Sequence, residues 1–372
     1  MPDALAGPCV RCLRNSTALA LVGHHLEKGG LRARPVGILS FSADQLIEEI
    51  GGRRKGELHL GLEKALLASR VDSDSDSRFA SACRHQGAFE WPACLLEDPE
   101  PPWVLTVSGD SKLIAGTPPG RAVALVGARK ANAYGRSTAR MLAHSAAGAG
   151  CVVVSGLAFG IDTEAHKGSL SFGSGRTVAV VGGGVDHVYP RSNARLFEEI
   201  SAAGCIVSEM PCGTGVWRWS FPARNRLIAA LSQMTVVVQA ARLSGSLHTA
   251  EAALLRGRTV AAVPGPINDP VSAGSNALIA DGALAVISTE SLAEALGFDQ
   301  PLQSVTPPAE LVGAWRLVTN GGLTEALSSG GPRSAEVMSD LTRLELLGMI
   351  QRLPGGGWVP IGHGGGSVGS TP

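Results

Sequence analysis

Residues 121–156 read RAVALVGARKANAYGRSTARMLAHSAAGAGCVVVSG, in which two Val-rich runs flank a segment of helix-forming residues. The runs VALVG (123–127) and CVVVSG (151–156) are short, continuous and apolar, as expected for strands buried on both faces of a sheet. The segment between them, YGRSTARMLAHSAAG, is long enough for a helix that crosses over to a parallel strand. Residues 121–156 therefore predict a β-α-β unit.

The same alternation continues along the chain. Further predicted strands are TVAVVG (177–182), CIVSEM (205–210), TVVVQA (235–240), TVAAVPG (259–265) and ALAVIS (283–288), and they alternate with helix-forming segments such as NARLFEEISAAG and SLHTAEAALLRG. We predict an α/β fold with an extended, Rossmann-like, doubly wound and mostly parallel sheet over residues 91–297.

The segments before and after this domain predict different structures. Residues 1–90 contain apolar positions at helical spacing, such as Leu46, Ile47 and Ile50, and predict a helical accessory region with a loose acidic run at 72–77. Residues 298–308 (FDQPLQSVTPP) predict a linker. Residues 309–361 predict three helices and two strands around a Gly-rich turn, typical of a winged helix, and 362–372 predict a disordered tail.

Composition limits the class of protein. The chain has 372 residues, 44% of them hydrophobic and 17% charged, which is enough to fill a large core. Its seven cysteines lack the spacing of a disulfide framework, and neither a signal peptide nor an apolar run of roughly 18 residues is present. We therefore predict a cytoplasmic protein without a membrane anchor.

Charge is unevenly distributed although the net charge is zero. Residues 121–258 contain 15 Lys and Arg against 7 Asp and Glu, whereas residues 259–297 contain four acids and no Lys or Arg. A local basic excess is expected for a protein that binds a polyanion, although a solvated charged face is the more common explanation for a moderate imbalance.

Polar and glycine residues follow several predicted strands. These loops contain Gly127-Ala128-Arg129, Ser155-Gly156, Gly182–Asp186 and Ser244-Gly245-Ser246. The carboxyl ends of parallel strands meet at one edge of a sheet, where backbone N–H groups and helix N-termini favour phosphate. For one loop alone, turn geometry and helix capping explain these residues equally well. Several such loops at one edge predict a site for an anion.

The segment VWRWSFPARNR (216–226) interleaves three aromatic residues with three arginines in a chain that has only 4% aromatic residues. Aromatic rings stack on bases and guanidinium groups bind phosphates, so the segment favours single-stranded nucleic acid. The alternative is that Trp217 and Trp219 pack beneath the loop while the arginines pair with Glu209 or Asp162.

Catalytic, cofactor and metal motifs are weak. The candidates His166, His187, His248, Asp162 and Glu209 lie in different loops without a nucleophile beside a base, so we predict no enzyme. GGGVDH (182–187) fails as a dinucleotide fingerprint because His187 stands at the third glycine position, and we predict no cofactor. We interpret Cys9 and Cys12 as free cysteines in a helix, since His24-His25 lack zinc-ligand spacing, and predict no metal site.

Taken together, these motifs resemble the DNA-processing protein A family, also called DprA or Smf, over about residues 91–297. The matching segments are LVGARKANAYG, VVSGLAFGIDTEAHKGSL, GGGVDHVYPRSN, SEMPCG, FPARNRLIAALS, SGSLHTAEAALLRGR and AVPGPI. The resemblance implies a Rossmann domain that binds single-stranded DNA in a basic pocket, forms a dimer and assists loading of the RecA recombinase during natural transformation. Many members also have a C-terminal winged helix, which the end of this chain resembles. Residues 298–372 contain only four Arg, so the alternative to DNA binding for this unit is a role in protein interaction.

The resemblance also implies which residues bind DNA. The predicted DNA-binding residues are Gly127, Arg129, Ser155, Gly156, Arg218, Phe221, Arg224, Asn225, Arg226, Ser244, Gly245 and Ser246. One departure is Ala128, where the family usually has Ser or Thr. Its loss of a hydroxyl donor predicts a weaker phosphate contact, while we expect the backbone N–H of the turn to remain.

Two other functions remain open. One is a phosphoribohydrolase related to the LOG group, for which SGSLHTAEA (244–252) lacks the PGG element although Glu251 lies nearby; adenine release from AMP would support it. The other is a transcription regulator whose Rossmann domain senses a nucleotide, which predicts tighter binding to a defined duplex than to an unstructured oligonucleotide.

Overall fold

The computed structural model describes residues 7–28, 41–72, 78–117, 121–173, 175–298, 309–319, 323–328, 332–346, 350–352 and 357–360. The predicted acidic run at 72–77, the linker and the tail fall largely outside these ranges. Among the described helices, none is both long and apolar enough to cross a lipid bilayer.

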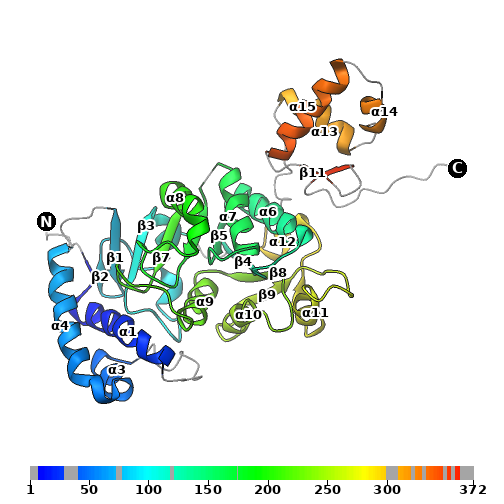
Figure 1. The fold of residues 1–372 in the computed structure, drawn as a ribbon. Helices are drawn as coiled ribbons and strands as arrows, with labels where there is room; N and C mark the ends of the chain where they lie inside the picture. The colour runs from blue at the N-terminus through cyan, green and yellow to red at the C-terminus, as the bar shows by residue number, and fades with distance from the viewer. Residues whose placement is uncertain are drawn as a thin grey trace.

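The main sheet has ten strands within the described ranges, in the spatial order β10-β9-β8-β4-β5-β6-β7-β3-β1-β2 (Figure 1). The strands are β1 (Phe79–Cys83), β2 (Gln86–Gly87), β3 (Leu105–Gly109), β4 (Ala122–Gly127), β5 (Val152–Ser155), β6 (Thr177–Val180), β7 (Cys205–Ser208), β8 (Met234–Gln239), β9 (Thr259–Ala262) and β10 (Leu284–Ala285). From β4 to β10 neighbouring strands run parallel, and β3, β1 and β2 extend the edge beside β7 with antiparallel pairs.

Helices cover both faces of this sheet. They are α5 (Lys112–Ala115), α6 (Ala133–Gly148), α7 (Ile161–Ser171), α8 (Ala194–Ala203), α9 (Ser220–Ala230), α10 (Leu247–Leu254), α11 (Ala273–Ala280) and α12 (Thr289–Ala295). Figure 1 shows α6, α7 and α12 on one face and α9, α10 and α11 on the other. The prediction of a doubly wound, mostly parallel α/β fold is confirmed.

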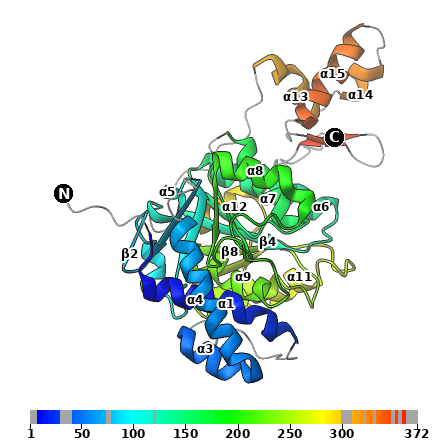
Figure 2. The same ribbon diagram turned by 60° about the vertical axis from the view of Figure 1, so that its left-hand side comes forward.

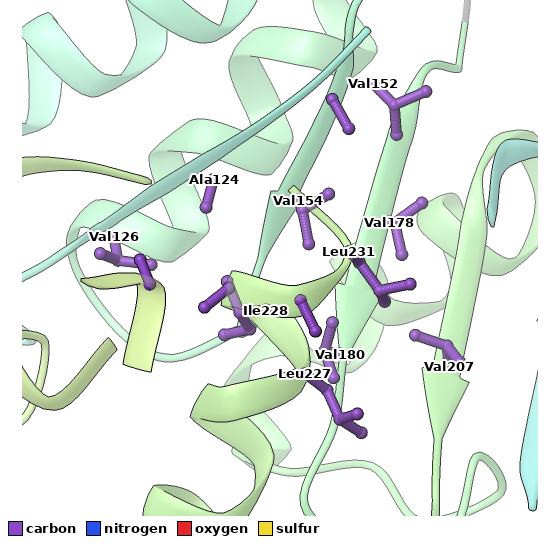
Figure 3. Packing of buried hydrophobic residues seen from close by; sticks show 14 of the residues in the cluster. Ala124, Val126, Val152, Val154, Val178, Val180, Val207, Leu227, Ile228 and Leu231 are labelled. Carbon is purple, nitrogen blue, oxygen red and sulfur yellow. The ribbon is translucent and has the colours of Figure 1, made fainter. Parts of the chain in front are cut away.

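Alternating strand residues explain why both faces are covered. Val123, Leu125 and Val153 pack beneath α6 and α7, while Ala124, Val126 and Val154 pack against the other face, because successive side chains of a strand point to opposite sides. On that second face, Leu227, Ile228 and Leu231 of α9 and its C-cap meet the strand valines (Figure 3). This packing fixes α9 over β4, β5 and β6.

The N-terminal helices are α1 (Val10–Lys28), α3 (Ala43–Ile50) and α4 (Lys55–Asp72), and they lie beside the β1–β2 end of the sheet in both views (Figures 1 and 2). Their shared core also contains Met210, Ala223 and the partly buried Trp219 of the central domain. Ser16 Oγ donates to the Glu209 carbonyl at 2.8 Å. Strands β1 and β2 fall within the predicted helical region 1–90 but pair with the central sheet.

The C-terminal unit contains α13 (Val312–Thr319), α14 (Leu323–Ser328) and α15 (Pro332–Leu346), followed by the antiparallel pair β11 (Ile350–Arg352) and β12 (Trp358–Pro360). Trp315, Leu341, Ile350 and Trp358 contribute to its separate core. Both views place the unit apart from the central sheet (Figures 1 and 2). The order of three helices and a β-ribbon agrees with the sequence pattern, and a winged-helix function for it stays a prediction.

Replacing Leu62, fully buried in the N-terminal core, tests how firmly these helices contribute to the fold. We expect Leu62→Ala to lower the free energy of unfolding by about 2–5 kcal/mol, because the substitution leaves a cavity. Leu60→Ala, on the same helix but 57% exposed, serves as the control and should change it by about 0.5 kcal/mol or less. Urea unfolding followed by circular dichroism measures both; equal effects would contradict the buried packing.

Candidate nucleic-acid interface

An open pocket of about 420 Å³, including space open to solvent, lies at the carboxyl ends of β4, β5 and β6. Its walls come from the loops after these strands, from the segment before α8, and from α9 with the residues before it. The lining residues are Arg129, Gly156, Ala158, Phe159, Val181, Gly182, His187, Tyr189, Pro190, Val216, Phe221 and Arg224. The structure thus brings together predicted site residues from two distant parts of the chain.

The pocket lies beside the switch point of the sheet, where the strand order reverses between β4 and β8. In many α/β proteins the ligand crevice is at the switch point itself. Here the fully buried side chain of Gln239 occupies that position, accepting the Asn132 N–H at 3.1 Å and donating to Ser272 Oγ at 3.2 Å. A crevice between β4 and β8 is therefore filled, and the open space lies over β4 to β6 instead.

Two guanidinium groups line the pocket, one from the loop after β4 and one from α9. Arg129 is exposed in the loop after β4, and its Cζ lies 4.8 Å from the centre of the Phe221 ring, which is cation–π geometry. Arg224, on α9, is only 5% exposed. The pocket therefore combines one solvated positive charge with one that the fold holds rigidly.

Backbone carbonyls hold Arg224 in place. Its Nη1 donates to the Gly156 carbonyl at 2.5 Å and to the Val180 carbonyl, and its Nε donates to Asn225 Oδ1 at 3.2 Å. Among the described residues, Nη2 has no acceptor. Burial lowers the pKa of Arg224 to about 10, so the group remains charged at neutral pH with one donor nitrogen left for a ligand.

Glycine is required at two predicted positions by close approach. A Cβ on Gly156 would lie 2.4 Å from Nη1 and 2.6 Å from Cζ of Arg224, so any side chain there would displace the guanidinium. A Cβ on Gly127 would lie 2.5 Å from Ile161 Cγ1 and 2.7 Å from the Gln239 carbonyl oxygen. Gly156 thus shapes the pocket, whereas Gly127 lets α7 pack against the end of β4.

Buried polar groups support the loop after β5. Leu157 has a φ of 56°, in the left-handed region that non-glycine residues rarely adopt. The Gly156 and Ala158 N–H groups donate to Asp162 Oδ2 at 3.2 and 3.4 Å, and the Leu157 N–H donates to His166 Nε2 at 3.3 Å. Burial raises the pKa of Asp162, while Arg224 opposes that rise. Because these three amides bind protein side chains, they are not free to bind phosphate.

The first loop shows the same pattern at Ala128. Its N–H donates to the Gln239 carbonyl at 2.7 Å, and its methyl group packs in the core beneath α6. The expectation that this N–H remains available to phosphate is wrong, because the β4–β8 pairing already uses it. In this loop Arg129 provides the exposed positive charge instead.

The serines of the predicted site lie outside the pocket. Ser155 is fully buried, and its Oγ donates to the Leu125 carbonyl at 2.7 Å. Ser244 and Ser246 pair through their hydroxyl oxygens at 2.8 Å. Asn225 Nδ2 donates to the Gly245 carbonyl at 3.3 Å, so this loop adjoins α9 without lining the pocket.

The aromatic and basic segment 216–226 divides between two environments. Phe221 and Arg224 line the pocket, whereas Arg226 is 2% exposed and pairs with Glu209 while donating to the Glu100 carbonyl at 2.8 Å. The structure does not bring Arg226 into the pocket. Arg218 is exposed at the surface and is not among the lining residues.

The two tryptophans of the segment stack on each other, with ring centroids 6.2 Å apart and 10° between the ring planes. Trp219 packs against the core of the N-terminal helices. Trp219 therefore packs beneath the loop, as the alternative interpretation of these residues predicts.

Sequence reasoning missed two further aromatic residues that line the pocket. Phe159 and Tyr189 are 45% and 42% exposed, and the Tyr189 ring centroid lies 5.5 Å from that of Phe221. Exposed rings beside guanidinium groups are suited to stacking on bases. The sequence does contain a pattern that could have identified them. Each stands in a strand-to-helix loop, Phe159 in LAFGID and Tyr189 in HVYP, where an aromatic side chain can reach the ligand edge of the sheet.

The suggested acid–base groups do not assemble at this pocket. Glu251 lies on the surface of α10 and pairs with His248 at 3.3 Å, and neither residue lines the pocket. His187 does line it, but His166 is fully buried beneath the β5 loop.

The buried Arg226–Glu209 pair gives a prediction about stability. Arg226→Met should lower the free energy of unfolding by about 3–5 kcal/mol, because it leaves the Glu209 carboxylate buried without its partner. The double variant Arg226→Met/Glu209→Leu removes both charges and should recover much of the loss. Chemical denaturation measures both variants, and a double variant as unstable as the single one would show that the ion pair is not the cause.

A pH dependence follows from His166. Burial lowers its pKa to about 3, from an ordinary value of 6.5, so in acid the unfolded chain takes up a proton that the folded chain does not. The stability contributed by the neutral ring is complete above about pH 6.5 and declines as the pH falls toward 3. His166→Gln should reduce the acid slope of the unfolding free energy by up to about 1.4 kcal/mol per pH unit.

Urea unfolding of wild type and variant across this pH range measures that slope. His248→Gln, which replaces an exposed ring on α10, is the control and should keep the wild-type slope. An unchanged slope in His166→Gln would exclude a buried neutral imidazole.

Comparisons with known proteins agree with this geometry. The family model described as DNA recombination-mediator protein A matches residues 84–297. The chain is 40% identical to DNA processing protein DprA of Bacillus subtilis over 226 residues (59% of this chain, 75% of that protein), and 36% identical to protein Smf of Escherichia coli over 281 residues (72% and 74%).

Two solved structures are also similar. DNA processing protein A from Streptococcus pneumoniae is 29% identical, with a TM-score of 0.58 over 78% of this chain and 96% of that one. DNA processing protein A from Helicobacter pylori, solved to describe its single-stranded DNA binding mode, is 31% identical, with a TM-score of 0.52 over 56% of this chain and 93% of that one. The family's description names a recombination mediator and not an enzyme. The chain belongs to the DNA recombination-mediator protein A family, the DprA/Smf proteins.

Proposed function

We propose that this protein binds single-stranded DNA in the pocket at the ends of β4, β5 and β6. The observation that carries the proposal is the meeting of Arg129 and Arg224 with the rings of Phe159, Tyr189 and Phe221 around one open space. Guanidinium groups bind phosphate oxygens and aromatic faces stack on bases, and single-stranded DNA presents both.

The chemistry of the pocket favours an unpaired strand over a duplex. Guanidinium groups and aromatic rings surround a space that is open to solvent. In a duplex, neighbouring bases cover the ring faces, so a base can stack on Phe159 or Tyr189 only when it is unpaired. The similarity to the H. pylori protein supports the same ligand.

The roles of the predicted site residues differ within this proposal. Arg129 and Arg224 contact phosphate, Phe221 holds the Arg129 guanidinium through a cation–π contact, and Gly156 leaves room for Arg224. The proposal adds Phe159 and Tyr189 as base-stacking residues. Ser155 and Arg226 act through the fold, since both are buried and bonded to protein atoms.

Family membership supports the wider role. We propose that the chain protects incoming DNA and assists loading of RecA during natural transformation, that it acts as a homodimer, and that it works in the cytoplasm. These steps rest on the family and on the pocket rather than on a contact with RecA or a second chain.

Binding of a fluorescent oligo-dT, followed by anisotropy, tests the pocket. Arg129→Ala should weaken binding about ten- to a hundred-fold, because it removes a charge-assisted phosphate contact. It should also make the plot of log affinity against log salt shallower by about 0.7 for each lost contact. Arg53→Ala, an exposed arginine of the N-terminal helical region, is the matched control and should bind like the wild type.

The same assay distinguishes this proposal from the alternatives. Phe159→Ala should weaken binding to oligo-dT while leaving the salt slope unchanged, since stacking involves no phosphate. Normal affinity in both Arg129→Ala and Phe159→Ala would place the DNA elsewhere. Tighter binding to a defined duplex, or release of adenine from AMP, would support the regulator or the hydrolase instead.

A further inference from the structure

Four potential metal ligands lie together far from the pocket. They are Cys9, Cys12, Cys83 and His85, and their ligand atoms all lie within 4.8 Å of one another. His85 Nδ1 is 3.6 Å from Cys9 Sγ, 3.5 Å from Cys12 Sγ and 3.9 Å from Cys83 Sγ. The imidazole nitrogen thus faces all three sulfur atoms.

The three nitrogen–sulfur distances are close to the corresponding edges of a tetrahedral zinc site. With zinc–sulfur bonds of about 2.3 Å and a zinc–nitrogen bond of about 2.0–2.1 Å, tetrahedral geometry puts nitrogen and sulfur about 3.6 Å apart. The three observed nitrogen–sulfur distances are within about 0.3 Å of this value. The sulfur–sulfur edges of such a site are about 3.8 Å, and the ligand atoms lie within 4.8 Å of one another, so modest side-chain movements bring all four to one zinc ion.

Two rigid elements present the ligands. Cys9 immediately precedes α1, its carbonyl accepts the Leu13 N–H at 3.0 Å, and Cys12 follows within the first turn of the helix. Cys83 ends β1, and the two-residue turn Arg84-His85 leads into β2, with Cys83 paired to Gln86. The site is thus made by a C-x-x-C at a helix start and a C-x-H on a hairpin turn.

Hydrogen bonds already join these two elements. The Cys9 N–H donates to Cys83 Sγ at 3.4 Å, and Gln86 Nε2 donates to the Gly7 carbonyl at 3.1 Å. A backbone N–H directed at sulfur stabilises the thiolate form, which is the form that binds metal. The approach of the two elements is therefore set by the backbone as well as by the ligands.

The surroundings are apolar on one side and open on the other. Cys12 and Cys83 are 1% and 2% exposed and pack with Val104 and the partly buried Trp103. His85 is exposed and Cys9 is half-buried, so a metal ion can enter from solvent. Closed sites with four protein ligands and a dry inner side are typical of structural zinc.

We propose that Cys9, Cys12, Cys83 and His85 bind one structural zinc ion that links the N-terminal helices to the edge strands of the central sheet. Three thiolates and one imidazole in a tetrahedral arrangement select zinc over hard cations such as Mg²⁺ and Ca²⁺, which prefer oxygen ligands. Because four protein ligands fill the coordination sphere, the ion stabilises the fold and has no open position for catalysis.

This assignment replaces the interpretation of Cys9 and Cys12 as free cysteines. Two of the proposed ligands, Cys9 and Cys12, are close together in the sequence, whereas Cys83 and His85 come from a hairpin about seventy residues later. The side chains of His24-His25, the pair weighed from the sequence, lie outside the part of the chain that the structure describes.

Metal analysis of the full-length chain, purified under reducing conditions without a histidine tag, tests the proposal. We expect one zinc ion per chain in the wild type and its loss in Cys9→Ser and His85→Asn, which change the two more accessible ligands and disturb the core least. Cys212→Ser and His59→Asn, outside the cluster, are the matched controls and should retain the ion.

Cobalt substitution tests the site in the wild-type chain, so its result does not depend on whether the variants fold. The metal-free wild-type chain titrated with Co²⁺ should develop the visible bands of tetrahedral cobalt and the near-ultraviolet thiolate charge-transfer band, with an end point at one equivalent. Removing zinc with a chelator should lower the melting temperature, and adding zinc should restore it.

Several results would overturn the proposal. They are a reduced wild-type chain that contains no zinc and gives no tetrahedral cobalt spectrum, equal metal content in the ligand variants and the controls, or a disulfide within the cluster under these reducing conditions. DNA binding by the pocket is measured separately, so failure of either proposal leaves the other intact.

Discussion

The candidate site depends on one buried cation, the Arg224 guanidinium, held by the carbonyls at the ends of β5 and β6. Burying a charge is unfavourable unless hydrogen bonds and opposite charge compensate. Here the carbonyls of Gly156 and Val180 and the nearby Asp162 carboxylate provide that compensation. Only glycine fits at position 156, because a Cβ there would overlap the guanidinium. Hydrogen bonds to Asp162 and His166 hold the loop that follows it. In the proposed site, a DNA phosphate would therefore meet a charge whose position is already fixed, because the conformational entropy of the Arg224 side chain is lost during folding and not on binding.

Helix geometry explains why neighbouring arginines have different roles. Along an α-helix, residues two apart point in nearly opposite directions, whereas residues three or four apart share a face. On α9, Phe221 and Arg224 share the face toward the pocket, and Arg226 points away to pair with Glu209. Treating the segment as one basic and aromatic patch overlooked this periodicity. Applied to the sequence, the helical spacing alone would have separated Arg224 from Arg226.

The sheet could be predicted because continuous Val-rich runs have few alternatives to a doubly covered parallel strand, and the runs at 123–127 and 235–240 both became central strands. The loops were harder, because the partner of each polar group is set by the tertiary structure. The sequence predicts that Ser155 binds DNA, yet its hydroxyl donates a hydrogen bond to the Leu125 carbonyl on the neighbouring strand. Likewise, no local pattern places Cys83 and His85 beside Cys12. Sequence periodicity predicts the elements, while contacts between distant segments decide what their side chains do.

The N-terminal helices contribute to the same architecture. Trp219 and Ala223, at the start of α9, belong to their core, and Ser16 on α1 binds the Glu209 carbonyl. The helix that presents Phe221 and Arg224 is thus packed between the strand valines on one side and α1, α3 and α4 on the other. Helix α1 is anchored in turn at its first residues, where Cys12 packs against the β1–β2 hairpin. A link at that hairpin, metal or otherwise, therefore restrains the helices that support α9, so the accessory region is structurally continuous with the wall of the pocket.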